Sequence, residues 1–117
     1  MAGTAHIVEK LQLLQALVQG EAVGDDVTEA TISKLLSYQL EKLRERQRQI
    51  REKLTAFEER YNLKTDEFSR RFREGRMGDA MDFFEWSALA DIYQDLSQRL
   101  TEAERVTHGA SDPGTPQ

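Results

Sequence analysis

The sequence predicts an all-α protein organised as an antiparallel helical hairpin, with a short N-terminal helix and a short connecting helix. Two heptad seams and the lack of any strand pattern predict this fold. The chain has 117 residues, 32% of them charged, and only two prolines. We expect one helical domain over residues 1–106 and a disordered tail over residues 107–117. Within the domain, helices are expected at about residues 5–19, 27–62, 65–74 and 80–105.

The first seam lies on the long helix. Its positions follow each other at steps of four and three residues, a heptad pattern that keeps one stripe facing a partner helix. No proline or glycine falls between Val27 and Gly75 to interrupt it. Its polar member, Gln47, is either a buried amide that fixes register and partner choice or a solvated position near a helix crossing. The seam consists of Leu36, Leu40, Leu43, Gln47, Ile50, Leu54, Phe57 and Tyr61.

The second seam lies on the C-terminal helix and predicts the partner of the first. The long helix has mostly basic flanks and the C-terminal helix mostly acidic ones, so the two are expected to pair antiparallel, with Trp86 against Tyr61. A parallel homodimer of the long helix would instead set Arg46 against Arg51 of its copy, which is a like-charge pair. The second seam consists of Trp86, Leu89, Tyr93, Leu96 and Leu100.

The long helix is longer than its partner, which predicts a homo-oligomer, with a dimer favoured. Ile32, Leu36 and Leu40 are expected to extend past the end of the C-terminal helix. The N-terminal helix repeats apolar residues at helical spacing from Ile7 to Val18 and can cover part of this stretch. Otherwise another chain covers it.

A surplus of aromatic and arginine side chains marks the expected surface for a protein partner. Phe83 and Phe84 are neighbours on one helix and cannot both face the seam, so one of them is expected to be exposed or to meet a partner. The arginines nearby either pair with neighbouring acids on a solvated face or form a patch that contacts RNA or DNA. They are also of the type enriched at protein interfaces, which makes them candidates for contact with a protein partner. The candidate partner-binding residues are Phe83, Phe84, Arg70, Arg71, Arg73 and Arg76.

No catalytic residue, metal or cofactor is expected. The chain has no cysteine, which excludes disulfides and thiolate metal ligands. Asp79, Asp82 and Glu85 recur every three residues, but acids in the first turns of a helix are explained by capping and by the helix dipole.

The net charge of −5 makes nucleic acid an unlikely partner. No apolar run approaches the ~18 residues of a membrane span, so a cytoplasmic protein is expected.

Short motifs over roughly residues 36–100 resemble a group of small prokaryotic helical proteins, many of them similar to the antitoxin partner in toxin–antitoxin gene pairs. The resemblance implies a non-catalytic protein that binds a partner protein, such as a toxin, and neutralises or scaffolds it. The alternative is a self-assembling coiled-coil structural subunit. The N-terminal 25 residues and the tail have no counterpart in that group. The motifs are Phe57-Glu-Glu-Arg-Tyr61, Asp66-Glu67-Phe68, Phe72, Gly75-Arg-Met-Gly78-Asp79 and Asp82-Phe-Phe-Glu-Trp86.

Overall fold

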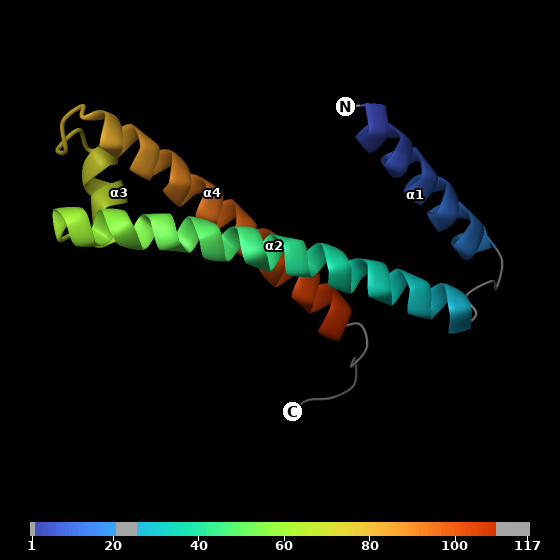
Figure 1. The fold of residues 1–117 in the computed structure, drawn as a ribbon. Helices are drawn as coiled ribbons and strands as arrows, with labels where there is room; N and C mark the ends of the chain where they lie inside the picture. The colour runs from blue at the N-terminus through green and yellow to red at the C-terminus, as the bar shows by residue number, and fades with distance from the viewer. Residues whose placement is uncertain (1, 21–25, 110–117) are drawn as a thin grey trace. The chain divides into compact units, whose positions relative to one another are not determined.

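The computed structural model describes residues 2–20 and 26–109, and the secondary structure in these ranges is entirely helical, which confirms the predicted all-α class. The chain divides into two compact units, Met1–Ser37 and Tyr38–Gln117. Figure 1 shows α1 (Ala2–Gly20), α2 (Asp26–Tyr61), α3 (Thr65–Arg73) and α4 (Met81–Glu104). The π-helical turn η1 (Arg105–Gly109) follows α4 directly.

The helix bounds differ from the expected ones mainly near the ends of the chain. α1 begins at Ala2 rather than at residue 5, so Thr4 lies inside it. At the other end, α4 is followed directly by η1, in which the Thr107 hydroxyl donates a 2.8 Å hydrogen bond to the Ala103 carbonyl oxygen. Residues 107–109 of the expected tail lie in η1. The remainder of the expected tail, residues 110–117, lies outside the described residues.

The second unit is the expected antiparallel hairpin of α2 and α4, with α3 crossing its closed end (Figure 1). The polar contacts between the two helices show that they run antiparallel, because residue numbers rise along α2 as they fall along α4. The Arg44 guanidinium pairs with Glu104 at 3.0 Å, and Gln47 Nε2 donates to Ser97 Oγ at 2.9 Å. Gln47 is thus half-buried and bonded across the hairpin, in keeping with a polar residue that fixes register.

Both seams supply the buried side chains of this unit. Leu54 in α2 and Trp86 in α4 are almost completely shielded from solvent, and so is Phe68 in α3. Members that are only partly buried pack around them. The fully buried seam residues are Leu40, Ile50, Leu54, Trp86, Leu89, Leu96 and Leu100, and those partly buried against the core are Leu43, Phe57, Tyr61 and Tyr93.

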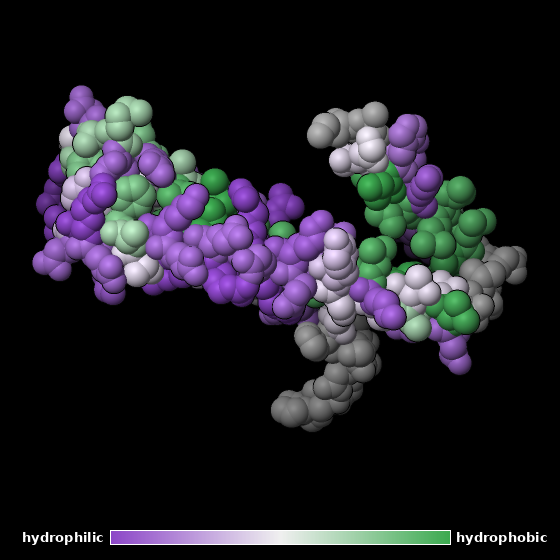
Figure 2. Space-filling view, in the orientation of Figure 1, coloured by the Kyte–Doolittle hydropathy of each residue, from purple (hydrophilic) through white to green (hydrophobic). Residues whose placement is uncertain are grey.

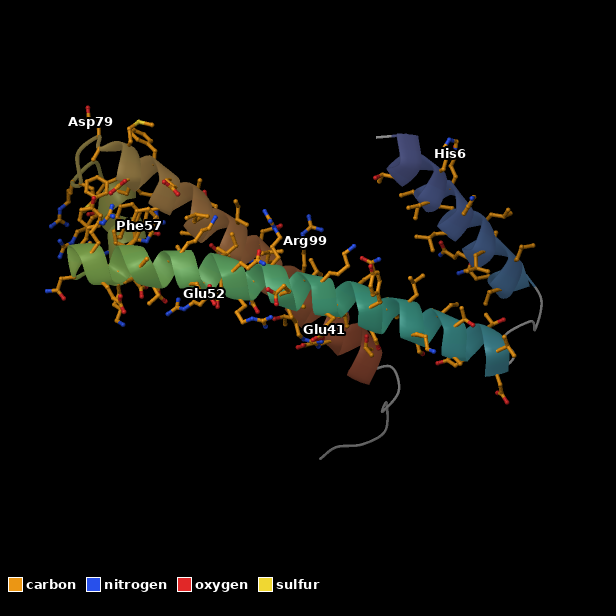
Figure 3. All side chains as sticks on the ribbon, in the orientation of Figure 1. His6, Glu41, Glu52, Phe57, Asp79 and Arg99 are labelled. Carbon is orange, nitrogen blue, oxygen red and sulfur yellow. The ribbon has the colours of Figure 1, made fainter. Side chains whose placement is uncertain are left out.

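Trp86 is the centre of the closed end. Its ring stacks on Phe68 of α3 with centroids 3.9 Å apart and planes 1° from parallel. On α2, Phe57, which Figure 3 labels, and Tyr61 stack on the same indole with centroids 5.5 and 5.8 Å away. The indole N–H donates to the Thr65 hydroxyl oxygen at 3.1 Å, so the one polar group of this buried ring is satisfied. One side chain therefore joins three helices.

Two left-handed residues let the chain turn around that end. Asn62 has φ 53° and follows α2, where the Leu63 amide donates to the Glu58 carbonyl oxygen at 3.1 Å. Gly75 has φ 74° and follows α3, where the Arg76 amide donates to the Arg71 carbonyl oxygen at 2.8 Å. Both are Schellman-type helix ends, for which asparagine and glycine are the favoured residues.

The N-terminal stretch of the long helix departs from the expectation at one position. Leu40 was expected beyond the reach of the C-terminal helix, yet it is only 7% exposed. α4 itself ends at Glu104, about where it was expected, but η1 continues the helix to Gly109 and so lengthens the partner of α2. Leu36, one turn earlier on α2, is 43% exposed, and so the buried part of the first seam begins at Leu40.

Leu54 is the most sensitive aliphatic position in this core. Replacing Leu54 with alanine should lower the free energy of unfolding by about 2–5 kcal/mol, because the change removes buried apolar atoms and leaves a cavity. Urea denaturation followed by Trp86 fluorescence measures it. Met81→Ala is the matched control, since Met81 is 80% exposed and its truncation should change stability by less than about 0.5 kcal/mol. Equal losses in the two variants would contradict this description of the core.

Candidate protein-interaction surface

The structure separates the two adjacent phenylalanines of α4. Phe83 is half-buried and turns into the core, where its ring meets Tyr61 edge-on at 5.2 Å and Phe68 at 5.8 Å. Phe84 is 51% exposed and makes an edge contact with Phe72 of α3 at 5.5 Å. Of the two candidates, only Phe84 is available to a partner.

Most of the arginine cluster is paired within α3 and the turn that follows it. Arg70 and Arg71 both contact the Glu67 carboxylate, and Arg70 also reaches Glu74. The hydrogen bond from Arg71, followed by that from Arg70, lowers the pKa of the Glu67 carboxyl group. Arg76 pairs with Glu74 at 3.0 Å. Three of the four candidate arginines are thus largely neutralised by acids close to them in sequence.

Arg73 is the exception. It is exposed, and among the residues that the structure describes it forms no ion pair. Its side chain lines a groove of about 570 Å³ between α2, α3 and α4. Arg51 of α2 also lines this groove and holds its guanidinium over the Tyr93 ring at 5.9 Å. Charge is mixed there, because Asp66 and Asp91 line it too.

Met81 was missed by the sequence analysis. It is the first residue of α4 and is 80% exposed. It stands three residues before Phe84, a spacing that places two side chains on the same helix face. Together with half-buried Phe72, these residues form what we call the Phe84 patch: Phe72, Met81 and Phe84. The signal for Met81 was its position just before the adjacent phenylalanines, at the start of the helix.

In the acid run at the start of α4, Asp82 connects α4 to the end of α2. Asp82 Oδ2 accepts a 2.6 Å hydrogen bond from the Tyr61 hydroxyl and pairs with the Arg60 guanidinium at 2.7 Å. Asp79 lies in the loop between α3 and α4, and the residue at the N-cap of α4 is Ala80, with no side-chain cap (Figure 3). Within the described ranges, no three His, Cys, Asp or Glu side chains gather as a metal site would need.

Comparison of this chain with protein-family models, with curated proteins and with solved structures found no match. In the part of the chain that the structure describes, no helix is both long enough and apolar enough to cross a membrane.

The Asp82 contacts make the stability of the hairpin depend on acid pH. The Tyr61 hydrogen bond, and then Arg60, lower the pKa of the Asp82 carboxyl group below its ordinary value of about 3.9. The ionised Asp82 carboxylate therefore contributes its full stabilisation above pH ~3.9, the pKa in the unfolded chain. This stabilisation is lost as the pH falls through the lower pKa that Asp82 has in the folded chain. Asp82→Asn should be less stable than the wild type at pH 7, and this difference should shrink toward pH 2.

Urea denaturation at a series of pH values from 7 to 2, followed by Trp86 fluorescence, measures that difference. Asp79→Asn is the matched control, because exposed Asp79 makes no hydrogen bond or ion pair with the described residues. The stability of this control should follow that of the wild type at every pH. A difference between wild type and Asp82→Asn that stays constant from pH 7 to 2 would contradict the prediction.

Proposed function

We propose that this chain is a non-catalytic protein-binding module that binds one partner protein through the Phe84 patch and Arg73. The observation on which the proposal depends is Phe84 itself, a large aromatic side chain that is half exposed yet held against Phe72. A ring that is already positioned loses little conformational freedom on binding, so most of its burial contributes to affinity.

The chemistry around Phe84 supports a protein partner. Aromatic, methionine and arginine side chains are the types enriched at protein–protein interfaces, and Phe84, Met81 and Arg73 supply one of each. Methionine adapts its shape to a partner because it is unbranched and flexible. Arg73 adds a cation without an ion pair among the described residues, which an acidic side chain of the partner can meet.

The resemblance to antitoxin-like proteins suggests what such binding achieves. A toxin whose active surface is covered by this module would be neutralised, and a partner of another kind would be scaffolded. The alternative, a coiled-coil subunit that assembles along the whole of α2, receives less support. From Leu40 onward, the members of the α2 seam are buried or partly buried in this chain's own hairpin, so this stretch is less available to another chain.

Truncation of Phe84 should weaken partner binding while the fold is retained. We expect Phe84→Ala and Arg73→Ala each to raise the dissociation constant of the complex about 30-fold, the effect of losing a hot-spot side chain worth ~2 kcal/mol. The partner to test first is the product of the adjacent gene in the native organism. If that product alone arrests growth, co-expression of the wild-type chain should restore growth, and Phe84→Ala should restore it less well.

Two matched variants control for non-specific effects. Tyr38→Ala removes an exposed aromatic ring elsewhere on α2, and Arg99→Ala removes an arginine of α4 that pairs with Asp95 (Figure 3). Both should retain wild-type affinity. If the chain is purified from the native organism and no partner protein comes with it, the proposal is overturned. A complex that both Phe84→Ala and Arg73→Ala leave intact would overturn the choice of surface.

A further inference from the structure

The first unit, Met1–Ser37, has no buried side chain among its described residues. Ten large apolar side chains there are between 36% and 74% exposed, six on α1 and four at the start of α2. Figure 2 shows hydrophobic residues gathered on the surface of α1. The ten residues are Ile7, Val8, Leu11, Leu13, Leu14, Leu17, Val27, Ile32, Leu35 and Leu36.

Helices in this state need something to cover them. An isolated helix is marginally stable in water, and in proteins most helical stability comes from the burial of one apolar face. α1 has 19 residues, and its Ile7, Leu11 and Leu14 repeat at helical spacing, which gives it a continuous apolar face. A contiguous exposed face of this kind marks an interaction site.

We propose that a second copy of this chain covers that face, so that the first units of two copies form the interface of a homodimer. Residues 11–19 of α1 carry no ionisable side chain. Two copies related by a twofold axis bring the same patch together, so the patch must be compatible with itself. An uncharged apolar face meets its own copy without like-charge repulsion, and it offers no charge by which to select a different protein.

A membrane surface is a poorer occupant. Helices that lie in the bilayer interface carry lysine and arginine on their polar face, where these residues meet anionic lipid headgroups. The polar positions in the second half of α1 are glutamines: Gln12, Gln15 and Gln19. The single lysine of α1, Lys10, is followed by no further cation up to Gly20.

The hairpin confines the interface to the first unit. α2 cannot pair with its copy beyond Leu40, because the seam is buried there. A parallel pair of whole α2 helices would also place Arg46 opposite Arg51 of the copy. A standard interface takes about 20–30 residues from each side, a size that the first unit reaches only if α1 and the start of α2 both contribute. Leu36 continues the α2 seam into this interface.

Light scattering on the full chain at a series of concentrations tests the proposal. The chain mass is 13.4 kDa, so the dimer has twice that, 26.8 kDa. The double variant Leu11→Asp/Leu14→Asp should raise the dimer dissociation constant at least 30-fold, roughly the effect of one hot-spot residue. Gln12→Asp/Gln19→Asp is the matched control, since it adds the same charge to the polar face and should leave the dimer intact.

Trp86 is the only tryptophan and is fully buried in the second unit, so its fluorescence shows in each variant that the hairpin is folded. Phe84→Ala should keep the wild-type mass, which separates this proposal from the proposed function. A wild-type mass of 13.4 kDa at high micromolar concentration would overturn the proposal. So would a mass above that of a dimer, or a dimer that Leu11→Asp/Leu14→Asp leaves intact.

Discussion

The stack of Trp86 between α2 and α3 is the interaction on which the rest of the second unit depends. A hairpin of two helices buries side chains along one seam only, because no third helix packs on it. Its ends are the places where the helices fray. Here Trp86 stacks on Phe68 of α3 and on Phe57 and Tyr61 of α2, and its indole N–H donates a hydrogen bond to the Thr65 hydroxyl oxygen. Because all four contacts meet on one ring, α3 cannot leave its place without exposing that ring to water.

The stacking around Trp86 also positions the Phe84 patch, the surface that we assign to a partner protein. Phe72 lies one turn after Phe68 on α3, so the stacking of Phe68 on Trp86 also fixes where Phe72 meets Phe84. Phe84 is therefore presented by a folded core. The first unit lacks such support, because none of its described side chains is buried. The two surfaces share no residue, and a change in one can be made without removing contacts of the other.

The sequence predicted those features that depend on periodicity and on order along the chain. Heptad spacing located both seams, and the opposite charges on the flanks of the two helices predicted their antiparallel pairing. The Arg44–Glu104 ion pair illustrates this pairing. The sequence did not decide which of Phe83 and Phe84 is exposed, because that depends on where α3 crosses α4. The exposure of Met81 does not follow from the sequence for a similar reason, since a residue at a helix start is buried or exposed according to what packs beside it.

Charge was the least predictable feature, and the reason is local geometry. Four arginines within seven residues suggest a basic surface, but helix positions three or four apart lie side by side, so Glu67 reaches both Arg70 and Arg71. Glu74 is placed in the same way to reach Arg70, and the turn at Gly75 lets it meet Arg76 as well. Arg73 lies six residues from Glu67 and next to Glu74, spacings at which side chains on a helix do not face each other. The cation left for a partner is thus determined by helix periodicity and not by the density of arginines.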